Sequence, residues 1–224
     1  MIKYYGWRDG AFVRISDCPD AYKENCVQRA LAFDHLKSVM DAYYELTPAT
    51  WARLQGICRL EQMEKNAHLL QIGDIPREFY FVCQGIFRAY ALGGENFDKE
   101  ITKNFFDEGR FPASVIALLR GEESRLAIQA LEDSVVIRID HDKYRGLLSE
   151  CEDLKWYHIL YLEKNWVMEK EPQELALLGS DSPQRYLEFI AQYPNILGRV
   201  RLHHIASRLG ITPTQLSRIR KNFE

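Results

Sequence analysis

The sequence predicts an α+β protein in which an antiparallel β-roll of jelly-roll type precedes a long helix and a small helical domain. Three observations predict this fold class. Short strand-like segments separated by glycines fill residues 64–139, helical spacing returns after Asp140, and two short amphipathic segments with a sharp turn between them end the sequence. Short strands at regular spacing with glycine turns are typical of an antiparallel sandwich or roll.

These patterns divide the chain into four segments. We expect an N-terminal extension of unassigned structure at residues 1–45, a roll at 46–150, a dimerisation helix at 151–179 and a helix-turn-helix domain at 180–224. Apolar residues at helical spacing predict a helix over residues 34–44. Thr47 followed by Pro48 predicts the start of the next helix, because threonine caps a first turn and proline needs no N–H there.

The remaining elements follow in chain order. Six strands are expected, at residues 68–74, 79–85, 87–94, 99–106, 127–131 and 134–140. Short helices are expected at 114–119 and 142–148, a long helix from 153 to about 178 interrupted at Pro172, and a helix capped by Ser182-Pro183 that ends at Gln192.

The last 23 residues carry the most specific pattern in the chain. Five apolar residues at helical spacing predict one buried face: Ile205, Leu209, Ile211, Leu216 and Ile219. Ala206 is small where two helices can cross closely, Gly210 can adopt a positive φ at a turn, and Thr212-Pro213 can begin a second helix. An ordinary helical hairpin needs only the apolar spacing, so the combination favours a DNA-binding helix-turn-helix.

Charge is divided unevenly along the chain. Residues 180–224 contain seven basic and three acidic residues, a net charge of +4, whereas residues 1–179 contain 22 basic and 29 acidic residues, a net charge of −7. An acidic body with a basic end is consistent with DNA binding. No apolar run reaches the roughly 20 residues that span a bilayer, and the first residues lack the apolar core of a secretory signal, so we expect a cytoplasmic protein without membrane contact.

Cysteines and histidines give no cofactor or enzyme pattern. The five cysteines form no CxxC pair and are expected to be free thiols: Cys18, Cys26, Cys58, Cys83 and Cys151. The six histidines include no His-x-His, and His68 is expected to be structural. No P-loop or nucleophile–base pair is present. We therefore expect no metal, iron–sulfur cluster or haem, and no enzymatic activity.

The long helix carries an apolar seam. Leu154, Tyr157, Tyr161, Asn165 and Met168 repeat at spacings of three and four residues, as in helices that pair. A helix packed in its own core has the same spacing. Because a helix that joins two domains has little of its own chain to bury against, we expect Leu154, Tyr157, Tyr161 and Met168 to form the seam of a homodimer.

From about Leu46 to Glu224, this order of parts resembles the bacterial Crp/Fnr-type transcription regulators. The segments that carry the resemblance are Gln71-Ile-Gly-Asp and Phe79-Tyr-Phe-Val-Cys-Gln-Gly-Ile-Phe-Arg in the roll, and Ile205-Ala-Ser-Arg-Leu-Gly-Ile-Thr-Pro-Thr-Gln-Leu-Ser-Arg-Ile-Arg in the tail. The resemblance implies a cyclic-nucleotide-binding-like roll, a dimerising helix and a domain that binds double-stranded DNA. It allows a small-molecule effector and a contact with RNA polymerase.

The roll departs from the family pattern where cyclic AMP is bound. Binding members carry Gly-Glu for the ribose and, eight or nine residues later, Arg-Ser/Thr-Ala for the phosphate. An ungapped match from Gly109 places these on Ala113-Ser114 and Ser124-Arg125-Leu126. A one-residue shift in an extended segment turns Arg125 to the other face, so we expect the roll to be kept and cyclic AMP binding lost. The candidate effector-pocket residues are Arg88, Arg110, Ser114, Ser124 and Arg125.

The second helix of the motif is expected to enter the major groove of DNA. Outside its buried face lie the DNA-binding candidates Thr212, Thr214, Gln215, Ser217, Arg218, Arg220 and Lys221. Arg218 is the candidate for a bidentate contact with guanine, and Gln215 for adenine or a phosphate. Arg220 and Lys221 are expected to contact phosphates.

The sequence therefore predicts a sequence-specific transcription regulator whose effector is unknown and is not cyclic AMP. Two alternatives stay open. One is a cyclic-nucleotide receptor with a rearranged pocket, and the other is a signalling or scaffold protein that no longer binds an operator.

Overall fold

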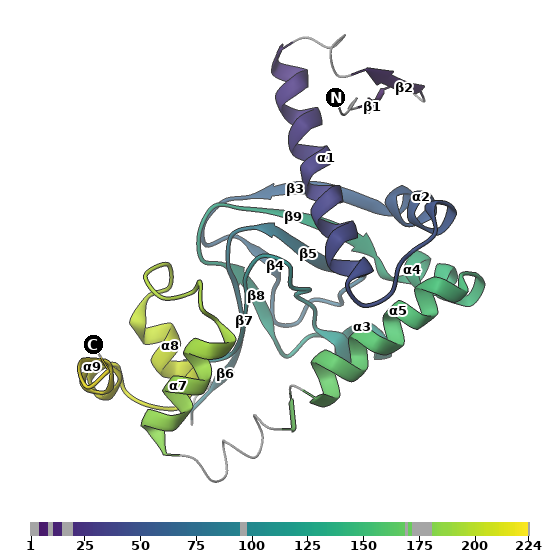
Figure 1. Ribbon diagram of the computed structural model, residues 1–224. Coiled ribbons are helices and arrows are strands. Elements are labelled where there is room, and N and C mark those ends of the chain that lie inside the picture. The colour runs from purple at the N-terminus through teal and green to yellow at the C-terminus, as the bar shows by residue number, and fades with distance from the viewer. Residues whose placement is uncertain are drawn as a thin grey trace.

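The computed structural model describes residues 5–8, 11–14, 20–94, 98–168, 170–171 and 181–223, and among these the side chains from residue 27 onward. Within this part of the chain, antiparallel strands form the body of the protein and helices pack around it, as the fold class predicts (Figure 1).

Two antiparallel sheets make the roll. One has the strand order β3 (Cys58–Met63), β9 (Ser134–Asp140) and β5 (Glu78–Gln84), and the other β4 (His68–Leu70), β8 (Ala127–Ala130), β6 (Phe87–Gly93) and β7 (Lys99–Phe106). Buried residues of both sheets, such as Val82, Phe87, Ile128 and Val136, form one core cluster. A separate hairpin pairs β1 (Tyr5–Arg8) with β2 (Ala11–Arg14).

The six predicted strands are confirmed, but β3 is not among them. Ile57 and Cys58 continue the apolar spacing of the helix before them, so the sequence pattern extends that helix too far. The helix ends at Gly56, and β3 begins two residues later, where Cys58 pairs with Ile139.

The helices follow the predicted order. They are α1 (Asp20–Asp41), α2 (Pro48–Gly56), α3 (Val115–Arg120), α4 (His141–Glu150), α5 (Glu152–Leu162), α7 (Ser182–Gln192), α8 (Leu202–Leu209) and α9 (Pro213–Lys221). After α5 the helix continues with π-helical geometry as η2 (Glu163–Met168). Its expected continuation to about residue 178, including Pro172, lies outside the described residues. Asp181 caps α7 in place of Ser182, since its side chain accepts the N–H of Gln184 at 2.9 Å.

Helix α1 corrects the expected role of the seam on α5. It belongs to the segment that the sequence leaves unassigned, and it packs with α2, α4 and α5 in one core cluster with Phe81 and Ile137 of the roll. Leu154 and Tyr157 are buried in that cluster, and Tyr161 packs against it. The Tyr43 ring, just after α1, lies 5.9 Å from Tyr157 and 5.5 Å from Tyr161.

Leu154, Tyr157 and Tyr161 therefore pack within their own chain, in the cluster that includes α1 and against the turn that follows it. Asn165, at the same helical spacing, donates to the Tyr43 hydroxyl at 3.0 Å. Met168 is excluded from this contact and is 68% exposed. The sequence did not indicate that an N-terminal helix covers the seam, because the pattern of a core helix and that of a pairing helix are the same.

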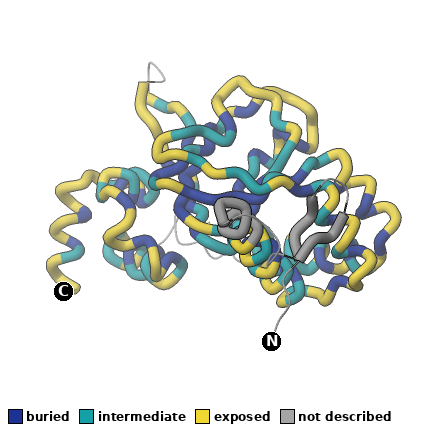
Figure 2. Tube along the Cα trace, turned by 90° about the horizontal axis from the view of Figure 1, so that it is seen from above, coloured by how far each residue is buried: buried dark blue, intermediate teal, exposed yellow. Residues whose placement is uncertain are grey.

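The last two helices, α8 and α9, follow each other with the expected turn between them. Ile205, Leu209, Leu216 and Ile219 are buried, as is Ala206, and Ile211 packs against them. Gly210 ends α8 with φ of 69°, which explains the glycine at the turn. In Figure 2, buried stretches run through the centre of the roll and recur along these helices.

Candidate functional site

The second helix of the motif, α9, begins with a capping box. The hydroxyl of Thr212 accepts the N–H of Gln215 at 3.2 Å, and the side-chain oxygen of Gln215 accepts the N–H of Thr212 at 2.9 Å. Pro213 occupies the first turn. The side-chain oxygen of Gln215 is thus engaged in the N-terminal cap of α9. In this conformation that oxygen is not free to accept a hydrogen bond from a base.

One face of α9 is polar and exposed. Thr214, Ser217, Arg218 and Lys221 are exposed and lie at positions i, i+3, i+4 and i+7, so they share one stripe. Arg220 is half-buried on another side of the helix. Figure 1 shows α9 on the outer side of α7 and α8, away from the sheets. The candidate DNA-binding residues are therefore brought together on an accessible surface.

The other side of the C-terminal domain packs against the roll. Ile86, Phe105 and Leu131 of the roll belong to the same core cluster as Tyr186, Phe189 and other apolar residues of the C-terminal domain. The Phe105 ring lies 5.9 Å from Phe189. The C-terminal helices thus pack against the roll, with α8 next to β7.

A buried arginine joins the two parts. Arg88 of β6 is 4% exposed and donates to the side-chain oxygen of Gln129 at 3.0 and 2.7 Å. It also pairs with Glu100 and donates to Nδ1 of His204 on α8 at 3.0 Å. Burial lowers the pKa of His204 to about 4, and the Arg88 charge adds to this. Arg88, an expected effector-pocket residue, therefore forms a contact between domains and does not line the cavity described below.

Further polar contacts lie along the same interface. The backbone N–H of Thr102 in β7 donates to the hydroxyl of Ser207 at 3.0 Å, and Tyr193 donates to Asn104. Arg199 forms ion pairs with Glu108 and Glu132 of the roll. These contacts place the DNA-binding candidates in a defined orientation relative to the roll.

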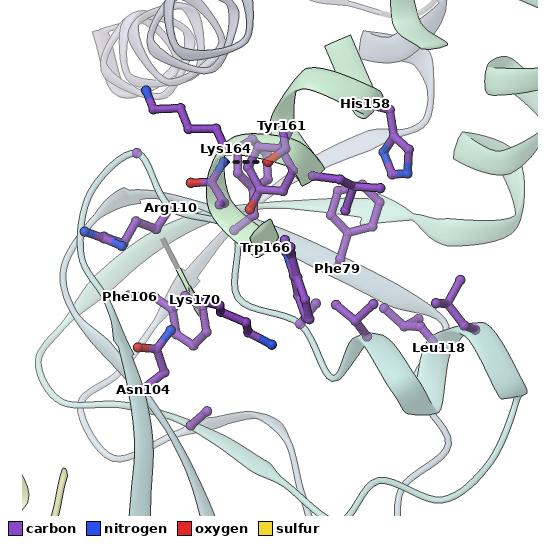
Figure 3. A pocket seen from close by; sticks show the side chains of 18 of the residues that line it. Phe79, Asn104, Phe106, Arg110, Leu118, His158, Tyr161, Lys164, Trp166 and Lys170 are labelled. Atoms are coloured by element: carbon purple, nitrogen blue, oxygen red, sulfur yellow. Dashed lines mark hydrogen bonds between the residues drawn. The ribbon is translucent and has the colours of Figure 1, made fainter. Parts of the chain in front are cut away.

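A cavity of about 780 Å³ lies beside this interface. Its lining comes mainly from β7, the loop that follows it, α3, α4 and the α5–η2 helix, with Gln192 of α7 and Arg208 of α8 (Figure 3). Of the five effector candidates, Arg110 alone lines it. Arg110 contacts Asp107 at 2.7 Å, lies 4.7 Å from the centre of the Tyr193 ring, and donates to the carbonyl of Gln192 at 3.1 Å.

The two serines that the sequence match aligns with the cyclic-nucleotide contacts are not open to a ligand. Ser114 and Ser124 are buried, and their hydroxyls bond to each other at 2.9 Å. The Ser124 hydroxyl also donates to the carbonyl of Leu126 at 2.7 Å. Arg125 is exposed and does not line the cavity. A phosphate at this place would therefore meet two mutually bonded hydroxyls and no cation, which does not compensate its burial.

Sequence reasoning missed Lys103, Trp166 and Lys170, which also line the cavity. No local pattern indicates that a strand residue meets a helix more than sixty positions later in the sequence.

The described cysteines are free thiols, as expected, and His68 forms a contact within the roll. Cys58, Cys83 and Cys151 are free thiols, and burial raises the pKa of Cys58 and of Cys83 to about 12. Cys18 and the Cys26 side chain lie outside the described residues. His68 Nε2 is 3.1 Å from the Tyr90 hydroxyl. Among the described side chains, no group of three or more His, Cys, Asp or Glu is placed to hold a metal ion.

Comparison with known proteins assigns the roll. Residues 60–151, from β3 through α4, match the family described as "Cyclic nucleotide-binding domain". The roll has the cyclic nucleotide-binding fold. A search of curated protein sequences gives no match. In the described part of the chain, no helix combines the length and the apolar character needed to cross a membrane.

Solved structures extend the likeness beyond the roll. FixK2 from Bradyrhizobium japonicum aligns with a TM-score of 0.60 and 18% identity over 74% of this chain and 84% of its own. A CooA mutant from Carboxydothermus hydrogenoformans gives 0.60 and 19% over 84% of each chain. The c-di-GMP responsive global regulator CLP of Xanthomonas campestris gives 0.58 and 14% over 79% and 91%. At these identities the likeness shows the fold alone, which this chain shares with these three proteins.

Proposed function

We propose that this protein is a sequence-specific DNA-binding transcription regulator of Crp/Fnr type. The observation that carries this proposal is the exposed polar stripe of α9, held in place by buried Leu216 and Ile219. A helix fixed by its apolar face and capped at its N-terminus can present its other face to the major groove without reordering. The fold of the solved relatives supports the same function.

The residues of α9 divide by their chemistry. Arg218 lies in the second turn and can form two parallel hydrogen bonds to guanine. Thr214 and Ser217 flank it on the same stripe and can donate to base edges or phosphates. Lys221 and Arg220 lie in the last turn and suit phosphates, which position the protein without reading sequence.

A second copy of the chain would supply the second recognition helix. On α5, Trp156, Ile159 and Leu162 are exposed on the face opposite to the one buried against α1. Exposed apolar residues along one helix face favour an interface between proteins. This face replaces the predicted seam in the proposed homodimer, whose two α9 helices would enter major grooves about 34 Å apart.

The test is a selection of DNA sequences by the purified full-length protein from a pool of random duplexes. Fluorescence anisotropy then compares a selected duplex with a scrambled one over a series of salt concentrations. We expect the selected duplex to bind about a thousandfold tighter or better, and both affinities to fall with salt. Equal affinity for the two duplexes at every salt concentration would contradict the proposal and favour the scaffold alternative.

A further inference from the structure

The cavity beside the domain interface has an unusual charge for a protein with a net charge of −3. Its described lining includes six lysines and arginines, namely Lys103, Arg110, Arg145, Lys164, Lys170 and Arg208, and a single carboxylate, Glu108. Glu108 is already engaged, since it pairs with Arg199 and accepts the N–H of Gly85 at 2.9 Å. The positive charge of the cavity is therefore not balanced from within its lining.

Two of these lysines, Lys103 and Lys170, line the same cavity and their charges interact. The pKa of Lys103 is lowered, first by loss of hydration and then by the charge of Lys170. Lys170 lies 4.0 Å from the centre of the Trp166 ring, which holds its ammonium group toward the cavity. Two ammonium groups that repel each other at a cavity wall are stabilised when an anion binds between them.

The opposite part of the cavity contains most of the aliphatic side chains, with His158 above them. Figure 3 shows Arg110, Asn104 and Lys170 on one side and Phe79 and Leu118 on the other, with Trp166 between them. The apolar lining of this part consists of Phe79, Val115, Leu118, Leu119 and Leu126. Leu119 lines the cavity and is nevertheless 64% exposed. A ligand with an apolar body would cover this side chain and remove it from water.

We infer that this cavity binds an amphipathic organic carboxylate, with its anionic group between Lys103 and Lys170 and its apolar body against α3 and Trp166. A volume of about 780 Å³ suits a molecule of this kind, because small-molecule sites are typically ~300–1,000 Å³. The bonded pair Ser114–Ser124 closes the place where a cyclic phosphate would bind. The role of this ligand as an effector rests on the proposed function, but its binding does not.

Binding can be measured with a fluorescent probe and four competitors. Anilinonaphthalene sulfonate, an aromatic anion, is first titrated into the full-length protein, and its fluorescence reports binding. It is then displaced with dodecanoate, biphenyl carboxylate, dodecanol and cyclic AMP. We expect one probe site per chain and displacement of the probe by at least one carboxylate. Dodecanol, which lacks the charge, should bind about tenfold more weakly than that carboxylate, or weaker still. If dodecanoate displaces the probe at lower concentration, the apolar body of the ligand is aliphatic. If biphenyl carboxylate does so, it is aromatic.

Variants locate the two ends of the ligand. Lys103→Gln and Lys170→Gln should each weaken the displacing carboxylate about tenfold and leave dodecanol unchanged. Leu119→Ser, at an exposed position, should weaken the carboxylate and the alcohol alike. Lys65→Gln is the matched control, because Lys65 is exposed in the turn between β3 and β4 and does not line the cavity. Thermal unfolding of each variant checks that the fold is intact.

Several outcomes would overturn the inference. These are no displacement by either carboxylate, equal displacement by dodecanol and dodecanoate, and unchanged carboxylate affinity in both lysine variants. Displacement by cyclic AMP as strong as by the carboxylates would also overturn it, in favour of a cyclic-nucleotide receptor with a rearranged pocket. None of these measurements uses DNA, so failure here leaves the proposed function standing, and loss of DNA binding leaves the ligand site standing.

Discussion

Replacing Arg88 by methionine tests whether this arginine holds the C-terminal domain against the roll. Its guanidinium is buried and donates to Gln129 in the roll and to His204 in α8. Methionine can fill much of the space of the arginine stem but donates nothing. The variant therefore leaves the oxygen of Gln129 and Nδ1 of His204 without this donor, while Glu100 loses its ion pair.

The expected cost follows from the burial of these groups. Each acceptor that loses its hydrogen bond costs about 1 kcal/mol net. Glu100 has a side chain that is 45% exposed and regains water, so its lost ion pair adds little. We expect the free energy of unfolding to fall by about 2 kcal/mol, of which about 1 kcal/mol, through His204, belongs to the interface between domains. A loss of about 1 kcal/mol makes opening of that interface about fivefold more frequent.

Hydrogen exchange of the α8 amides measures this opening directly. Arg138→Met is the control, because Arg138 lies in β9 and pairs with Glu61 and Glu78 within the roll. We expect the Arg88 variant to speed exchange in α8 about fivefold relative to this control. Equal exchange rates in α8 for the wild type, the Arg88 variant and the control would refute the reasoning.

Three further predictions address DNA binding, assembly and pH. Arg218→Ala should cost about 1–3 kcal/mol per half-site on selected DNA and little on scrambled DNA, whereas Lys221→Ala should weaken both and make the salt dependence shallower by about one charge per subunit. Equal losses on both DNAs for the Arg218 variant would make that residue a phosphate contact. Ile159→Glu should give monomers by light scattering, because it places a charge on each copy of an exposed apolar face, and an unchanged mass would exclude this face as the interface. His204 should loosen the docked domain in acid. Its pKa is about 4 in the folded chain, chiefly through burial and then through Arg88, and about 6.5 when free. The free form therefore binds the proton first, and the docked state loses stability as pH falls from about 6.5 to about 4. The loss of stability should be measured as faster hydrogen exchange of the α8 amides at lower pH. His204→Gln should remove that pH dependence.

The candidate DNA surface could be predicted from sequence because its information is local. Apolar spacing, the glycine turn and the Thr212 cap all act within one turn of their own position, and they fix which face of α9 is exposed. The use of Gln215 in the cap was also readable, since a threonine followed three residues later by glutamine is a capping-box pattern. The contact that Arg88 makes between domains could not be predicted in this way, because its partners Gln129 and His204 are 41 and 116 residues away in sequence.

The sequence by itself determined the order of most elements, the last two short helices, and the residues that stand at the aligned cyclic-nucleotide positions, because periodicity, caps and side-chain identity are local properties. Only the tertiary structure decided that α1 covers the seam of α5, that Arg88 joins the roll to α8, and that Lys103 and Lys170 share one cavity. The physical reason is that an apolar face or a buried charge requires some partner, and any segment of the chain with the right shape can supply it. Which segment does so depends on the packing of the whole chain.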